Sequence, residues 1–120
     1  MSSEEKLKEI YELSILYDFY GELLGDHKKQ IFEDYILNDL SLAEIADNAG
    51  ISRQGVHDVV KRCTKALREY EERLHLVQKF ELTKQLVEEI RQISGEIYKN
   101  GNVAQIQEIV TRSERILQEL

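Results

Sequence analysis

The stretch from residue 52 to residue 65 holds side chains that can read DNA bases and bind phosphate groups. Arg53 can donate two hydrogen bonds to guanine, and Gln54 can pair in the same way with adenine. Ser52 suits a phosphate if a helix begins there, because the first backbone N–H groups of a helix are unpaired. The residues expected to contact DNA are Ser52, Arg53, Gln54, His57, Asp58, Lys61, Arg62 and Lys65.

The charge of this stretch differs from that of the chain around it. The 120 residues carry a formal net charge of -7. Residues 52–68 contain five lysine or arginine residues and one acidic residue, Asp58. Their local charge is therefore +4, and the rest of the chain carries -11. Because salt screens charges beyond about 8 Å, an acidic body does not prevent binding through a local basic strip. With about three or four phosphate contacts, we expect weak non-specific affinity, modest salt dependence and a need for two copies of the module.

A helix-turn-helix is the element that would position these side chains, and residues 41–62 supply its parts. Ser41 and Glu44 have the spacing of a capping box. Ala46 is the small residue where two helices approach each other, and Gly50 lies in the turn. In such a motif the first residues of the second helix face base edges, while later residues reach phosphates. The two helices are expected to share faces at Ile45, Ala49, Ile51, Val56 and Val59.

The composition predicts an all-α chain, since no proline and only 6 glycines occur. Apolar periodicity and capping residues place helices at about residues 4–23, 26–38, 41–50 and 52–76. Ser2 with Glu5 is expected to cap the first helix, and Asp26 the second. The heptad pattern that starts at Val56 and continues through Leu74 to Val77 breaks at Glu81, so a bend or a new helix is expected near 76–82.

The remaining residues predict a helical hairpin, with a turn at residues 100–102. Two amphipathic helices cannot bury both of their apolar stripes alone, so they must pack on the N-terminal domain or on another subunit. We therefore expect a helix-turn-helix domain at 1–76 and a C-terminal extension at 77–120 that forms a homodimer. The stripe of the first helix is Leu86, Ile90, Ile93 and Ile97, and that of the second is Val103, Ile106, Val110, Leu117 and Leu120.

Several other classes of protein are excluded by what the sequence lacks. No window approaches the roughly 18 apolar residues that a membrane-spanning helix needs, so no membrane insertion and a cytoplasmic location are expected. Cys63 and the three histidines have no metal-ligand spacing, so Cys63 is expected to pack on an apolar helix face and no metal or cofactor is expected. Without a Gly-rich phosphate loop or a nucleophile set of defensible spacing, the chain is not expected to be an enzyme.

Two further features have both a structural and a functional interpretation. The tyrosines on or near apolar stripes are expected to be core residues rather than base-stacking platforms. Gly55 lies inside a helix, where glycine costs about 1 kcal/mol relative to alanine. For Gly55 we favour tolerated sequence variation over the alternative, in which the missing side chain lets a DNA or protein backbone come close to the helix. The tyrosines concerned are Tyr11, Tyr17, Tyr20 and Tyr35.

Residues 10–76 resemble the YlxM-like family of small bacterial helix-turn-helix proteins. The most specific segments are DFYG at 18–21, NDLSLAEIA at 38–46, ISRQGVHD at 51–58 and EYEERLHL at 69–76. That family is similar to region four of bacterial sigma factors, which reads promoter DNA. The resemblance implies that Arg53, Gln54 and His57 occupy the face presented to bases.

The resemblance also implies a context, because family members are encoded beside genes for the signal recognition particle protein and its receptor. Two hypotheses follow. The chain is a dimeric DNA-binding regulator that reads a near-palindrome, acting in or on the signal recognition particle pathway. Alternatively, it is a protein or ribonucleoprotein adaptor of that machinery, which keeps the fold without specific DNA binding and holds a basic partner through acidic residues such as Glu69, Glu71 and Glu72.

Overall fold

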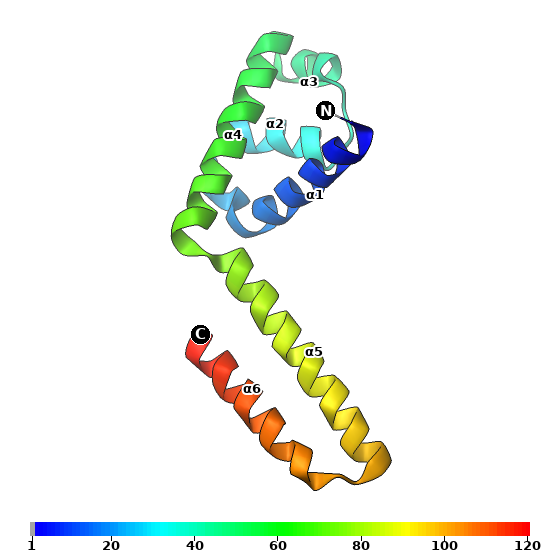
Figure 1. Ribbon diagram of the computed structural model, residues 1–120. Coiled ribbons are helices and arrows are strands. Elements are labelled where there is room, and N and C mark those ends of the chain that lie inside the picture. The colour runs from blue at the N-terminus through cyan, green and yellow to red at the C-terminus, as the bar shows by residue number, and fades with distance from the viewer. Residues whose placement is uncertain (1) are drawn as a thin grey trace. The chain divides into compact units, whose positions relative to one another are not determined.

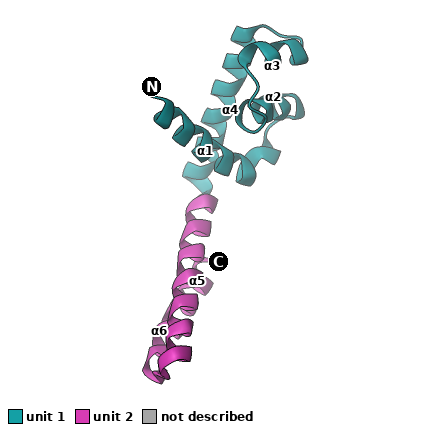
Figure 2. Ribbon diagram, turned by 90° about the vertical axis from the view of Figure 1, so that its right-hand side faces the viewer, with its two compact units in different colours: residues 1–75 teal, residues 76–120 magenta. Residues whose placement is uncertain are grey.

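The computed structural model describes residues 2–120, and their elements are helices and turns (Figure 1). No strand occurs in this described range, so the expected all-α fold is confirmed. The chain divides into two compact units, residues 1–75 and 76–120 (Figure 2). The elements are α1 Ser3–Tyr20, a 3-10 turn Gly21–Leu23, α2 Asp26–Ile36, α3 Leu42–Ala49, α4 Arg53–Leu74, α5 Leu76–Asn100, a 3-10 turn Val103–Gln105 and α6 Ile106–Glu119.

The first unit packs α1, α2 and α3 along one side of the long helix α4 (Figure 1). Aromatic rings join these helices. The rings of Tyr17 and Phe32 lie 5.9 Å apart between α1 and α2, and those of Tyr20 and Tyr70 lie 5.8 Å apart between α1 and α4. The Tyr20 hydroxyl also donates a hydrogen bond to the Glu71 carboxylate at 2.5 Å. These contacts fix the direction of α4.

The helix-turn-helix has its own apolar core, formed by Ile31 of α2, Ile45 and Ala46 of α3 and Val56 of α4. Ile45 and Val56 are fully buried. The small side chain of Ala46 lets α3 and α4 approach each other at the turn. Half-buried residues surround this core. Every residue predicted to lie on the face that α3 and α4 share belongs either to the core or to these half-buried residues. The surrounding residues are Tyr35, Leu40, Ala49, Ile51, Val59 and Val60.

Local capping sets the ends of α3. The Ser41 hydroxyl accepts a hydrogen bond from the Glu44 N–H, and the Glu44 carboxylate accepts one from the Ser41 N–H, which completes the predicted capping box. Gly50 follows α3 with φ 70°, a left-handed conformation that other residues adopt at a cost. The turn at residues 50–52 therefore follows from sequence chemistry, and α4 begins directly after it.

Four expectations about the first unit were wrong in detail. Gly25, not Asp26, caps α2, and Asp26 is the first helical residue without a capping hydrogen bond. Tyr11 is exposed, unlike Tyr17 and Tyr20, because α1 projects that part of its surface into solvent. Leu74 is exposed, because α4 ends there and the heptad pattern does not continue across the break. The break is at His75, with φ 56°, one residue before the expected range.

The second unit is the predicted helical hairpin of α5 and α6 (Figure 2). Leu86 and Ile93 of α5 are buried against α6, as the predicted stripe requires. The half-buried apolar residues of α6 are Ile109 and Ile116. The half-buried Arg112 on the same helix donates a hydrogen bond to Glu89 of α5 at 3.2 Å. The stripe predicted for α6 is therefore not the one that faces α5, and it stays exposed.

Candidate nucleic-acid interface

The N-terminus of α4 is fixed by Ser52, whose hydroxyl oxygen accepts a hydrogen bond from the Gly55 N–H at 2.9 Å. Ser52 is extended, with φ -76° and ψ 161°, as an N-cap residue should be. The Ser52 oxygen thus serves its own helix, but its O–H group can still donate to a phosphate. The capping leaves other backbone N–H groups of the first turn for an anion.

Gly55 packs against its own turn. A Cβ at this position would lie 3.2 Å from the Ser52 hydroxyl oxygen and 3.5 Å from a terminal carbon of Ile51. The missing side chain therefore makes room for the capping hydroxyl of Ser52, while the distance to Ile51 is an ordinary van der Waals contact. The Cβ that alanine would add faces these two side chains, which gives Gly55 a structural reason within its own turn.

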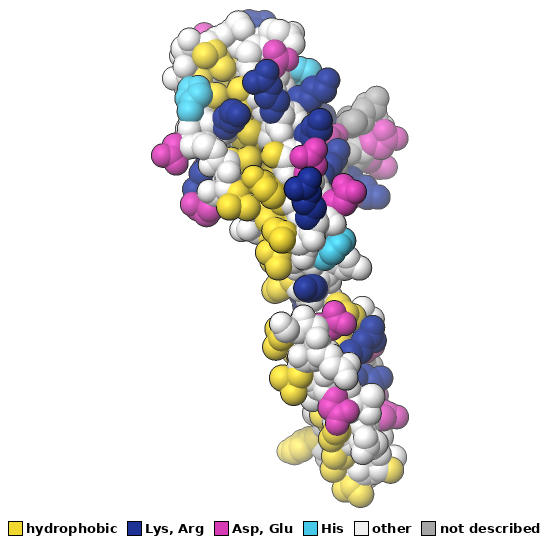
Figure 3. Space-filling view, turned by 90° about the vertical axis from the view of Figure 1, so that its left-hand side faces the viewer, with side chains coloured by type: hydrophobic (Ala, Val, Ile, Leu, Met, Phe, Trp, Pro, Cys, Tyr) yellow, Lys and Arg dark blue, Asp and Glu magenta, His cyan; other side chains and the backbone are white. Residues whose placement is uncertain are grey.

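The polar face of α4 carries the residues expected to contact DNA. Gln54, Asp58, Lys61 and Lys65 are spaced by four, three and four residues, so they form one exposed stripe opposite the buried side of the helix. Arg53 and His57 are not part of that stripe but form a parallel pair at one of its edges, four residues apart. Figure 3 shows Lys and Arg side chains gathered on the first unit. All eight predicted residues are exposed.

Two of these side chains already contact each other. The Gln54 amide nitrogen donates a hydrogen bond to a carboxylate oxygen of Asp58 at 3.0 Å. The same oxygen lies 3.9 Å from the Nδ1 atom of His57. Asp58 therefore holds Gln54 in place, and it puts a negative charge inside the basic stripe.

The cations of α4 differ in whether the protein neutralises them. Among the described residues, Arg53, Lys61 and Lys65 form no ion pair with a carboxylate, and their charges are available to a ligand. A guanidinium nitrogen of Arg68, by contrast, lies 3.8 Å from a carboxylate oxygen of Glu9 on α1. The sequence did not reveal this contact, because the two residues are 59 positions apart. The charge of +4 counted for residues 52–68 is thus partly compensated at its C-terminal end.

Arg62 lies apart from the other predicted residues. It lines a hollow of about 160 Å³ with Lys28 of α2, beside Leu24, Cys63 and Tyr70. Lys28 is exposed there and adds a second cation that the sequence analysis missed. Its distance of 34 residues from Arg62 left no signal in the sequence. Arg62 and Lys28 form a second basic position on a different side of α4 from Arg53.

Exposed carboxylates border the motif on α3. Glu44 and Asp47 are exposed, and α3 contains no lysine or arginine. Phosphates are repelled by this helix and attracted by the start of α4. The electrostatics thus favour an approach of a duplex from the Arg53 and Lys61 side of the motif.

Cys63 is buried, as expected, on the apolar side of α4. Burial raises the pKa of its thiol above the usual value, although the charge of Lys28 opposes the shift. Within residues 2–120, no group of three or more His, Cys, Asp or Glu side chains is placed to hold a metal ion. None of the described helices is long and apolar enough to cross a membrane.

Comparison with known proteins bears out the helix-turn-helix interpretation. Residues 7–118 match the model of the UPF0122 family, described as "Putative helix-turn-helix protein, YlxM / p13 like". A UPF0122 protein of Caldanaerobacter subterraneus is 49% identical over 80 residues, which cover 67% of this chain and 68% of the relative.

Two other bacterial relatives extend the match along the chain. A UPF0122 protein of Symbiobacterium thermophilum is 41% identical over 86 residues, covering 72% of this chain and 80% of the relative. One of Thermoanaerobacter sp. is 39% identical over 108 residues, covering 90% of this chain and 92% of the relative. Both units are thus shared with the relatives, and the chain belongs to the UPF0122 family of YlxM/p13-like helix-turn-helix proteins.

Proposed function

We propose that this protein is a DNA-binding regulator that binds duplex DNA with the first four turns of α4. The observation that carries the proposal is the set of exposed cations, Arg53, Lys61 and Lys65, that no carboxylate of the described chain neutralises, directly after a well-formed helix-turn-helix turn. Arg53 and Gln54 are at the N-terminal end, where such helices meet base edges. Lys61 and Lys65 are about two and three turns further along, where they reach phosphates.

The charge distribution sets the expected strength of this binding. Lys61 and Lys65 face phosphates and Arg53 lies beside them, so about two or three counterions are released, and affinity falls with salt but less steeply than for a strongly basic protein. The carboxylates of α3 and Asp58 oppose indiscriminate attraction to DNA. Binding therefore depends on correct base contacts more than on charge.

Selection from a random-sequence duplex library tests the proposal. The wild-type protein should enrich a short motif, and Arg53→Ala should lose that enrichment while its circular dichroism stays unchanged. Arg73→Ala is the matched control, because Arg73 is an exposed cation in the last turn of the same helix. An absence of enrichment by the wild type, or equal enrichment by Arg53→Ala, would overturn the assignment of α4 as the recognition helix.

The regulatory target that we propose lies in the signal recognition particle pathway. Support for this context comes from the family resemblance, and it makes duplexes from the control regions of that pathway's genes the first defined probes. Binding to those duplexes that is no tighter than binding to scrambled duplexes would remove the pathway from the proposal and leave DNA binding itself intact.

An adaptor function is the second candidate, because the exposed face of α4 changes sign along its length. After Arg68 the exposed charged residues of α4 are Glu69, Glu72 and Arg73, which leave a net negative charge that suits a basic partner. Glu71 is not part of this acidic end, because it accepts the hydrogen bond from Tyr20. Reversal of Glu69 and Glu72 to lysine should abolish partner capture and spare DNA binding if the adaptor function holds. Retained capture by the double variant would contradict it.

A further inference from the structure

The hollow that Arg62 lines combines an apolar floor with positive charge at its edge. Its volume is about 160 Å³, and it lies between α4 and residues 23–28, which lead from α1 into α2. Two of its lining side chains, Lys28 and Arg62, are exposed cations. Apart from Gly25, the others are apolar or aromatic: Leu23, Leu24, Cys63, Ala66 and Tyr70. A ligand that fills this space, which we call the Arg62 hollow, must offer an apolar group together with negative charge.

The protein covers the apolar part of the Arg62 hollow incompletely. Leu24 and Cys63 are buried, with 8% and 1% of their surface exposed, whereas Leu23 is 56% exposed. Ala66 and Tyr70 of α4 are half-buried. Figure 3 shows apolar side chains gathered on the first unit, close to those of lysine and arginine. The hollow therefore has a buried floor, with exposed apolar surface and exposed cations around it.

No carboxylate of the described chain neutralises the two cations. Within residues 2–120, neither Lys28 nor Arg62 forms an ion pair. The next residue, Lys29, does form one, because its ammonium nitrogen lies 2.6 Å from a carboxylate oxygen of Glu22. The charge of Lys28 reaches the thiol of Cys63, where it opposes the rise in pKa that burial causes. Lys28 therefore places its charge close to the apolar floor, and this charge is available to a ligand.

The Arg62 hollow faces a different direction from Lys61, which belongs to the stripe proposed to contact DNA. One residue along a helix is a rotation of about 100°, so Arg62 and Lys61 point to different sides of α4. Four residues are a full turn and about 40° more, and steps of this size carry Ala66 and then Tyr70 toward the side of the buried Cys63. The three residues thus form a row along α4 that begins with a cation and continues with apolar surface. A phosphate can use the cation but not the rest of the row.

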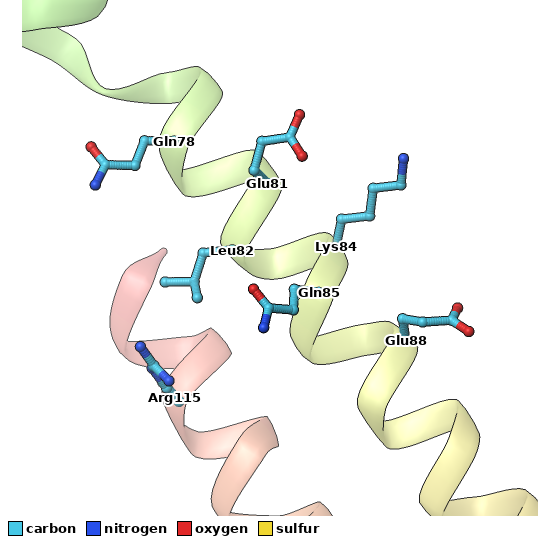
Figure 4. Close-up of a pocket in the computed structure, with 7 residues that line it drawn as sticks. All are labelled: Gln78, Glu81, Leu82, Lys84, Gln85, Glu88 and Arg115. Carbon is cyan, nitrogen blue, oxygen red and sulfur yellow. The ribbon is translucent and has the colours of Figure 1, made fainter.

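The larger hollow of the second unit does not have this chemistry. Its volume is about 780 Å³, and Leu82 is the one apolar side chain among those that Figure 4 labels. The carboxylates of Glu81 and Glu88 are matched in number by the cations of Lys84 and Arg115. Mixed charges of this kind select neither an acidic nor a basic ligand. The Arg62 hollow is smaller, but its charge and its apolar lining together point to one class of ligand.

We propose that the Arg62 hollow binds an acidic amphipathic helix of a partner protein. One large apolar side chain of that helix fills the hollow, since a cavity of about 150 Å³ has room for a benzene molecule. Carboxylates one turn away on the same helix lie beside Lys28 and Arg62. This interaction does not depend on DNA binding, because it uses a different side of α4.

The fold and the charge of the protein both favour such a helix as the occupant. Residues 2–120 contain no strand, so an extended peptide finds no sheet edge to pair with. The row of Arg62, Ala66 and Tyr70 runs along α4, and a helix packed beside it presents residues three or four apart to the same surface. Most of this chain, with its net charge of -7, repels an acidic helix, whereas the Arg62 hollow attracts it. Glu69 repels carboxylates two turns after Arg62, which directs the acidic residues of the partner toward Lys28.

Selection from a displayed library of helical peptides tests this proposal with the full-length protein. The wild type should enrich peptides that carry one large apolar residue with aspartate or glutamate one turn away. Combining Lys28→Glu with Arg62→Glu should invert the charge preference, so that the enriched peptides carry lysine or arginine beside the same apolar residue. Loss of folding cannot produce such an inversion. Lys6→Glu with Lys8→Glu is the matched control, because it changes the net charge equally on exposed residues of α1 that do not line the hollow.

Fluorescence anisotropy with one enriched acidic peptide measures the charged and the apolar part of the hollow separately. Arg62→Ala should weaken peptide binding about tenfold, because it removes a charge partner of the peptide. Leu23→Ser should weaken it about threefold, because it removes exposed apolar contact. Both side chains are exposed, so neither substitution should change the helix content measured by circular dichroism.

A wild type that enriches no acidic peptide would overturn the proposal. If the double variant of Lys28 and Arg62 also loses duplex binding in that case, the two cations belong to the DNA interface instead. A preference for acidic peptides that survives in the folded double variant would show that another surface binds them, and an equal loss in the control would assign the preference to net charge. If the double variant does not fold, Arg62→Ala decides, since weaker peptide binding supports the proposal and unchanged binding contradicts it.

Discussion

The side-chain amide of Gln54 donates a hydrogen bond to the carboxylate of Asp58, one helical turn along α4, at 3.0 Å. The bond joins a residue that can read adenine to the one acidic residue in the basic stripe. It restrains the rotamers of Gln54 before DNA arrives, and it leaves the amide oxygen of Gln54 outside this contact. Asp58 thus has two opposite effects on the proposed DNA binding, since it orders Gln54 and repels phosphates.

Asp58→Asn separates these effects. Asparagine can still accept a hydrogen bond from Gln54, but the negative charge is gone, so affinity for any duplex should rise about threefold at low salt. Fluorescence anisotropy measures the change in affinity for a specific duplex and for a scrambled duplex. The control is Glu72→Gln, which removes one charge near the other end of α4. An equal gain from the control would mean that net charge, and not the position of Asp58, sets the affinity.

Lys61 and Lys65 should contribute to binding through phosphates alone. Replacing either with alanine should weaken specific and scrambled duplexes by similar factors and reduce the slope of log affinity against log salt by about 0.9. Arg68→Ala is expected to change the slope less, because Arg68 lies 3.8 Å from Glu9 and is already partly neutralised. Titrations at four or more salt concentrations give the slopes. A larger change for Arg68 than for Lys61 would contradict the assignment of the stripe.

Local chemistry explains which parts of the fold were predictable. The capping box of Ser41 and Glu44 and the left-handed Gly50 depend on residues within three or four positions, so the sequence alone indicated them. The face of α6 that meets α5 was not predictable in the same way. Ile109 and Val110, like Ile116 and Leu117, are adjacent apolar residues, so two stripes about 100° apart were both compatible with the sequence. Packing against α5 chose between them.

The candidate site follows the same division. The position of Arg53 and Gln54 at the start of α4 depends on Ser52 and Gly50, which are close in sequence. Whether a cation of the candidate site is free to bind a ligand depends on carboxylates that are far away in the sequence. The partial neutralisation of Arg68 by α1 and the approach of Lys28 to Arg62 arise only when the helices pack. The sequence therefore indicated the candidate residues, but not which of their charges other side chains neutralise in the folded protein.

Tyr17 should make the protein less stable at alkaline pH. Burial, followed by a hydrogen bond that its hydroxyl donates to Glu33 at 3.1 Å, raises the pKa of Tyr17 from 10.0 to about 12. Above pH 10 the unfolded chain loses this proton while the folded chain keeps it, so the free energy of unfolding falls as pH rises from about 10 to about 12. Urea unfolding of wild type and Tyr17→Phe across this range measures the loss. A slope that is as steep in Tyr17→Phe would assign it to other groups.

Ser41→Ala and Ser52→Ala form a matched pair that separates stability from binding. Both serines are N-caps whose hydroxyl accepts a backbone N–H, Ser41 on α3 and Ser52 on α4. Each substitution should lower the free energy of unfolding by about 1 kcal/mol. Only Ser52 is at the start of the proposed recognition helix, so Ser52→Ala should also weaken duplex binding by about tenfold, since a phosphate contact and the order of the first turn are lost together. Urea unfolding and anisotropy on the same samples compare the two. Equal binding by both variants, with equal loss of stability, would show that the start of α4 does not contact DNA.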